Sequence, residues 1–243
     1  MTWRIETQPA AVASQSAAAA PLPRNAMNAL RVFDIETGPG PLEEIAPLIP
    51  PFDPPANIRD PVKIEERRRE HAQRAIGDAA LSAITGRVIA IGVKDHDGIG
   101  QVLDGDGREK QLLVDFWRHI EAERDDRRNP VLVGFNSHQF DLPFLLRRSW
   151  IHGVPVPGWV RSGRWWDRRF VDLRELWLAG TRDTGGSLDT IAKACGLGAK
   201  TGSGAEFAAL WMSDRARAVE YLTNDLAITE ALAVRLGVES LPA

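Results

Sequence analysis

The chain has 243 residues, of which 44% are hydrophobic and 26% are charged. This length supports one domain with a sizeable core, and the absence of any run of about 18 apolar residues argues against a membrane protein. The net charge of −3 excludes a broad basic surface of the kind that coats nucleic acid, although an enzyme that grips only a terminus needs few phosphate contacts.

Residues 1–28 are rich in Ala, Pro and Ser without apolar periodicity, so we expect a disordered tail, and Met27 is an alternative start. The segment lacks the apolar core of a signal peptide and is a poor transit peptide. A single cysteine, Cys195, excludes an intramolecular disulfide and suits a reducing compartment. We therefore expect a cytoplasmic protein in which Cys195 is a small core residue.

The first predicted strand begins near residue 29 and carries Asp34 and Glu36, and a Gly/Pro cluster at Gly38, Pro39 and Gly40 closes it. Residues i and i+2 of a strand share a face, so both carboxylates should project from its C-terminal end, where open α/β sheets bind ligands. Hard divalent cations prefer such clustered oxygen ligands. Alone, however, an Asp-x-Glu pair at the end of a strand usually caps the strand and faces solvent.

An insertion follows at about 38–80, Pro-rich at first and then a charged helix from about Val62 to Ala80. Its Glu and Arg residues predict a solvated face with intrahelical ion pairs. Beyond it, the pattern predicts strands at 87–94, 99–104, 130–135 and 170–172, and helices at 108–124, 141–152, 187–196 and 214–235. The short turn from Asp95 to Gly98 makes the first of these strands antiparallel, and the later alternation predicts a layered α/β domain.

Two further acidic motifs lie in the second half of the chain. A polar turn from Asn136 to Phe140 leads into a helix that opens at Asp141, where the helix dipole favours a carboxylate. In the last helix, Tyr221 and Asp225 are four residues apart and therefore share a face. Each motif alone has a plain structural alternative, a helix cap beside a core aromatic or a neutral surface pair.

Together, the three motifs resemble those of the DEDD-type 3′-to-5′ exonucleases of the ribonuclease-H-like fold, in the Tyr branch found in proofreading domains of family B DNA polymerases. The resemblance covers about residues 29–236, and Glu220 stands where the sister branch has His. It implies one α/β exonuclease domain at 29–243, with a mixed central sheet, antiparallel in its first strands and then parallel, flanked by helices.

The resemblance also implies hydrolysis of phosphodiester bonds with two metal ions, Mg²⁺ or Mn²⁺. Asp34 would bridge both ions, Glu36 and Asp225 would complete the site of the nucleophilic water, and Asp141 would hold the second ion. Tyr221 would orient the attacking water, because a phenol with an ordinary pKa near 10 is not ionised at neutral pH.

Substrate contacts are expected from six residues: Thr37, Asn136, Phe140, Arg164, Trp165 and Lys200. Arg164 and Trp165 lie in segment 159–169, where arginines alternate with tryptophans that could stack on bases. The equally weighted alternative is a loop whose tryptophans fill the core. His138 lies in the turn of the second motif, and the five histidines show no zinc-type spacing.

We expect the substrate to be single-stranded DNA with a 3′ hydroxyl end, degraded to 5′ mononucleotides, with a polymerase or replication partner in trans because the domain uses nearly the whole chain. Two alternatives stay open. One is an exoribonuclease or structure-specific nuclease of the same fold. The other is a catalytically silent nucleic-acid-binding or polymerase-accessory module, which the retention of all four carboxylates and the tyrosine disfavours.

Overall fold

The computed structural model describes residues 30–95, 100–122, 131–160, 166, 169–182 and 185–238. In these ranges, five strands form one sheet in the order β3-β2-β1-β4-β5. Their bounds are β1 Leu30–Pro39, β2 Gly86–Lys94, β3 Gly100–Leu103, β4 Val131–Gly134 and β5 Phe170–Asp172. β1 with β2 and β2 with β3 are antiparallel, whereas β1 with β4 and β4 with β5 are parallel. The predicted mixed sheet is confirmed, while most of the predicted turn at 95–98 lies outside the described residues.

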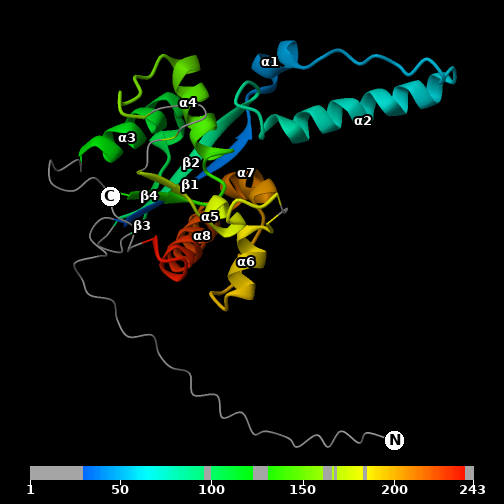
Figure 1. Cartoon of the computed structure of the whole chain (residues 1–243). Helices are drawn as coiled ribbons and strands as arrows, with labels where there is room; N and C mark the ends of the chain where they lie inside the picture. The colour runs from blue at the N-terminus through cyan, green and yellow to red at the C-terminus, as the bar shows by residue number, and fades with distance from the viewer. Residues whose placement is uncertain are drawn as a thin grey trace, which may run out of the picture.

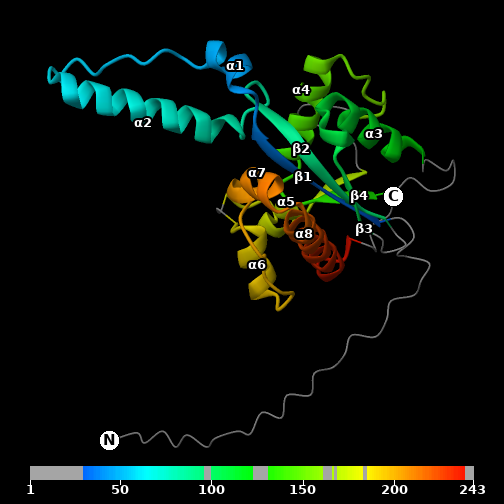
Figure 2. The same ribbon diagram turned by 180° about the vertical axis from the view of Figure 1, so that it is seen from behind.

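Helices cover both faces of this sheet (Figures 1 and 2). Their bounds are α3 Glu109–Ala122, α4 Asp141–His152, α5 Leu173–Leu178, α6 Leu188–Ala194, α7 Gly204–Ser213 and α8 Arg215–Arg235. α3 and α4 bury apolar residues such as Phe116 and Leu145 against Phe33 and Ile35 of β1. α6, α7 and α8 build the cores on the opposite face, where the alternate residues of β1 point. No helix in the described part of the chain has the length and apolar character to cross a membrane.

The segment between β1 and β2 contains α1 Leu42–Ile45, the 3₁₀ turn η2 Ala46–Leu48 and α2 Pro61–Ala79. α2 projects away from the sheet (Figure 1), and only its last residue, Ala79, is buried. The Asp60 side chain accepts a hydrogen bond from the Val62 N–H at 2.9 Å and caps the helix. Glu70 pairs with Arg67 at 3.0 Å and with Arg74 at 3.5 Å, so the predicted charged helix with intrahelical ion pairs is confirmed.

β1 ends at Pro39, within the Gly/Pro cluster that was predicted to close it, and β2 pairs with it as far as Gly86. Asp34 and Glu36 were expected at the C-terminal end of the strand, but they lie inside it because this pairing continues beyond Glu36. Several short elements went unpredicted, of which α5 and α7 are the longest and the 3₁₀ turn η3 Gly105–Gly107 is another. α7 lacks a polar face that would mark it as amphipathic, and only Asp214 separates it from α8.

Candidate active site

The first-motif carboxylates lie on the part of β1 that has lost its parallel partner. β4 pairs with β1 only from Leu30 to Val32, so the N–H groups that follow on that edge need other acceptors. Asp141, in the first turn of α4, accepts the Ile35 N–H through Oδ1 at 3.1 Å. The second motif is thereby attached to the backbone between Asp34 and Glu36.

α8 approaches the sheet closely over the first motif because β2 has no side chain at Gly92, the residue paired with Asp34. A Cβ atom at Gly92 would lie 2.9 Å from Leu222 Cγ and 2.9 Å from Leu226 Cδ1 of α8. This close packing places α8 next to the part of the sheet that carries the carboxylates. Tyr221 and Asp225, one turn apart, lie on this buried face of α8 with exposed fractions of 4% and 0%.

Carboxylate oxygens from β1 and α8 converge as predicted. Asp34, Glu36 and Asp225 each offer an oxygen, and these three atoms lie within 4.8 Å of one another. Asp141 is buried beside them, and its charge interacts with that of Asp34. The structure therefore brings all four predicted acidic residues to one place, from three separate segments of the chain.

Burial raises the pKa of each of these carboxyl groups. For Asp34, burial and then the negative charge of Asp225 raise the pKa to about 7. Burial, followed by the charge of Asp34, raises the pKa of Glu36 and of Asp141 well above the usual range. Burial also raises the pKa of Asp225, and Lys200 opposes this rise. The cluster thus favours cations, which relieve both the burial of charge and the mutual repulsion.

Lys200 supplies one cation to this cluster. Its Nζ lies 2.6 Å from Asp225 Oδ2 and 5.2 Å from the centre of the Tyr221 ring. Burial would lower the pKa of Lys200, but the charge of Asp225 raises that pKa above its usual value. The loop that carries Lys200 is tied down twice, since Asp189 Oδ1 accepts the Lys200 N–H at 2.9 Å and the Asn224 side chain donates to the Ala199 carbonyl at 3.2 Å.

Tyr221 keeps its proton at neutral pH. Burial, together with the charges of Glu36 and Asp225, raises the pKa of the phenol above its usual value, and Lys200 only partly offsets this. The Tyr221 hydroxyl lies near Asp225 and Lys200, but neither this hydroxyl nor Asp225 Oδ1, both buried, has a hydrogen bond of good geometry to any residue that the structure describes. Buried polar atoms of this kind call for a ligand or water, and clustered carboxylate oxygens are the donor set that Mg²⁺ or Mn²⁺ requires.

The structure describes some of the residues expected to contact substrate but not all of them. Asn136 and Phe140 lie in the turn between β4 and α4, and Asn136 has a left-handed φ of 61°. Thr37 is buried beside Glu36 at a bulge in β1. Arg164 and Trp165 lie outside the described residues. A cavity of about 460 Å³ adjoins Tyr221, and it is lined by the segment 201–203 together with α7 and the first half of α8.

Trp159 and Trp166, the two tryptophans of segment 159–169 that the structure describes, pack against the core. Trp159 stacks on Phe170 with ring centres 5.5 Å apart, and Trp166 meets the same ring edge-on at 6.4 Å. Arg169 lies over the Trp159 ring at 3.9 Å. For these two tryptophans, the core-filling alternative is therefore the one that the structure supports.

Two supporting acids escaped the sequence analysis. Asp172 at the end of β5 accepts backbone N–H groups from the second-motif turn, and Asp189 holds the Lys200 loop. Asp172 also caps α5 through the Arg174 N–H at 2.8 Å. An Asp between a short strand and a helix signals a cap, but nothing local to Asp172 reveals its contacts with a turn more than 30 residues earlier.

Comparison with known proteins identifies the family. Residues 79–237 match the family described as predicted 3′-5′ exonucleases related to the exonuclease domain of PolB. The chain belongs to this family. The match includes Asp141, Tyr221 and Asp225 and begins after the first motif. The activity in the family's description, that of a 3′-5′ exonuclease, is a hydrolase activity on nucleic acid.

The fold of the exonuclease is that of a known polymerase region. The family B DNA polymerase of the hyperthermophilic archaeon Pyrobaculum calidifontis matches 85% of this chain at 21% sequence identity with a TM-score of 0.53. This chain spans 24% of the polymerase, about a quarter of its length. The likeness supports the ribonuclease-H-like arrangement of the mixed sheet and its flanking helices. A comparison with curated proteins gives no match.

Proposed function

We propose that the protein is a metal-dependent exonuclease that removes 5′ mononucleotides from the 3′ ends of single-stranded DNA with two Mg²⁺ or Mn²⁺ ions. The observation that carries this proposal is the convergence of Asp34, Glu36 and Asp225 oxygens within 4.8 Å, beside a buried Asp141. A cluster of buried carboxylates is unfavourable for stability, so its retention suits a catalytic purpose.

The carboxylates fit the proposed ions by chemistry and by placement. When bound, the ions would lower the pKa of a water nucleophile and neutralise the leaving 3′ oxygen. Asp34 and Glu36 on β1 and Asp225 on α8, whose oxygens lie within 4.8 Å of one another, would hold the ions together with Asp141 beside Ile35. The protonated Tyr221 hydroxyl is available to hold the attacking water by donating a hydrogen bond to it.

The remaining proposed contacts concern the substrate. Lys200 Nζ is positioned to meet a phosphate oxygen as well as Asp225, because an ammonium has three donors. Asn136 and Phe140 would shape the pocket of the terminal nucleotide.

A buried site must receive an unpaired end, and each frayed step of a duplex costs about 1.4 kcal/mol of stacking, which supports single strands as the substrate. The relationship to PolB supports DNA over RNA and a role at replicating or repaired ends.

The test uses purified protein with Mg²⁺, Mn²⁺ or chelator and end-labelled oligonucleotides. We expect a ladder of products shortened from the 3′ end of linear single-stranded DNA, no cleavage in chelator and none by Asp34→Asn. Equal digestion of a sealed circular strand would replace the exonuclease with an endonuclease. Preference for RNA would favour the exoribonuclease alternative, and inactivity on every substrate would favour the silent binding module.

A further inference from the structure

The second-motif turn is fixed to β5 and α5 by one buried carboxylate. Asp172 Oδ1 accepts the Asn136 N–H at 2.9 Å, and Oδ2 accepts the His138 N–H at 2.9 Å. Oδ1 also accepts the Arg174 N–H at the start of α5 at 2.8 Å. The turn and the helix thus share one acceptor, and the turn contains the strained Asn136 and, two residues beyond His138, Phe140.

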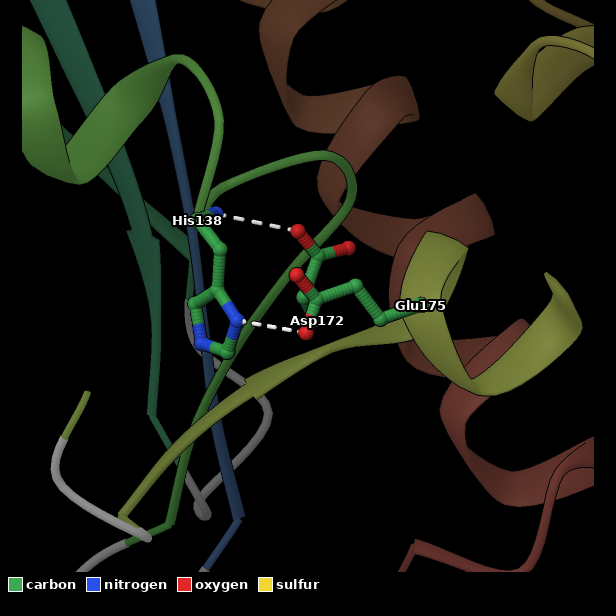
Figure 3. Close-up of side chains that lie close together, drawn as sticks. All are labelled: His138, Asp172 and Glu175. Atoms are coloured by element: carbon green, nitrogen blue, oxygen red, sulfur yellow. Dashed lines mark hydrogen bonds and ion pairs between the residues drawn. The ribbon is translucent and has the colours of Figure 1, made fainter. Parts of the chain in front are cut away.

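The His138 ring adds a second attachment (Figure 3). Its Nδ1 lies 2.8 Å from Glu175 Oε2 on α5, and its Nε2 lies 3.2 Å from the Phe170 carbonyl oxygen on β5. The ring also stacks on Trp166, with centres 5.8 Å apart and planes 22° from parallel. A carboxylate and a carbonyl only accept hydrogen bonds, so an N–H of the His138 ring can donate to Glu175 or to the Phe170 carbonyl.

A metal ion is the competing occupant of this cluster. His138, Asp172 and Glu175 each offer a ligand atom within 4.8 Å of the others. A metal, however, requires a ring nitrogen without its proton and free carboxylate oxygens. Here both ring nitrogens face acceptors, and both Asp172 oxygens already accept backbone N–H groups. These contacts therefore favour a hydrogen-bonded histidine over a metal ligand.

We propose that His138 is a positioning residue of the exonuclease. It holds the second-motif turn against Glu175 and the Phe170 carbonyl, and through the turn it orients Asn136 and Phe140 toward the terminal nucleotide. This inference rests on the proposed function. Asp141 has its own attachment to the Ile35 N–H, so the carboxylate cluster does not depend on His138.

The experiment compares the full-length parent with His138→Phe, His138→Gln and the matched control His71→Phe on α2, whose ring lies 5.7 Å from Phe52. His138→Phe keeps an aromatic ring against Trp166 and loses both ring nitrogens. We expect its KM for a single-stranded oligonucleotide to rise about tenfold, the loss expected for a hydrogen bond to a charged group, with kcat within about threefold of the parent. His138→Gln keeps one N–H donor for Glu175 and should recover part of the loss.

Amide hydrogen exchange supplies a readout that does not depend on cleavage. In His138→Phe, residues 134–140 should exchange faster than in the parent and in His71→Phe, while the amides of α8 stay unchanged. An unchanged KM and unchanged exchange in His138→Phe would overturn the inference. So would calorimetric titration with Zn²⁺ or Mn²⁺ that finds an ion bound by the parent and lost in His138→Phe. A parent that cleaves no nucleic acid would refute the proposed function, whereas the exchange result would still decide whether His138 holds the turn.

Discussion

Neutralising Asp34 should stabilise the protein in chelator while abolishing cleavage. Burial and the charge of Asp225 raise the pKa of Asp34 from 3.8 to about 7. A rise of about three units corresponds to at most about 4 kcal/mol in favour of the neutral form. Because Asp34 keeps partial contact with solvent, we expect about half, or about 2 kcal/mol, which is a gain of about 4–8 °C in the melting temperature of Asp34→Asn.

The pH dependence has a definite sign. When the pKa of a carboxyl group is higher in the folded than in the unfolded state, ionising the group lowers the free energy of unfolding. This loss is absent below about pH 4 and grows as the pH rises to about 7. In chelator, the gain in melting temperature of Asp34→Asn over the parent should therefore be small at pH 4 and reach its full size by pH 8. Asp78→Asn, a neutralised exposed aspartate on α2, is the matched control and should show no such trend.

Added metal should make the parent melt at a higher temperature than Asp34→Asn, the reverse of their order in chelator. Ions that bind only the folded state stabilise it by mass action, by about 2.7 kcal/mol at one hundred times the dissociation constant, and the parent should gain far more than the variant. Scanning calorimetry in chelator and in Mg²⁺ or Mn²⁺ measures both effects. Strong destabilisation of Asp34→Asn in chelator, or an equal metal shift in both proteins, would mean that Asp34 is a structural hydrogen-bonding residue.

Other changes test the neighbouring parts of the site. Tyr221→Phe should lower kcat by about 10²- to 10⁴-fold yet leave measurable turnover, whereas Asp225→Ala should lose nearly all; equal losses in two well-folded variants would contradict these roles. Gly92→Ala should cost about 1–3 kcal/mol of stability by pushing α8 from the sheet, while Gly77→Ala, where an added Cβ meets nothing within 4 Å, should be neutral or stabilising in thermal unfolding. Lys200→Met removes a charge that lowers the pKa of three acids, so its melting temperature in chelator should fall more steeply than the parent's between pH 5 and pH 8.

The strands and the long helices could be predicted because their signals are local. Period-two and helical patterns located β2, β4, α4 and α8 to within a few residues. The spacing of Tyr221 and Asp225 also fixed their shared face on α8. The Gly/Pro cluster also marked the end of β1, which falls at Pro39. The position of Asp34 and Glu36 inside the strand was not predicted, because it depends on how far the pairing with β2 extends.

Contacts between segments that are distant in the sequence limit how much of the site could be predicted from the sequence. The convergence of the three motifs followed from family resemblance rather than from spacing. The attachment of Lys200 by Asp189, and of the second-motif turn by Asp172 and His138, depends on loops that meet only in three dimensions. No periodicity records such contacts, because each residue sits in an ordinary polar turn when it is considered alone.

The hydrogen bond from the Ile35 N–H to Asp141 means that the four carboxylates are not independent units in a mutational analysis. Asp141→Ala would remove an acid and also leave a buried N–H without its acceptor, between Asp34 and Glu36. Part of the loss measured for Asp141→Ala would then belong to displacement of the first motif. A double-mutant cycle between Asp141→Ala and Glu36→Ala should yield a combined loss smaller than the sum of the two single losses, so activity cannot be divided among the four acids one by one.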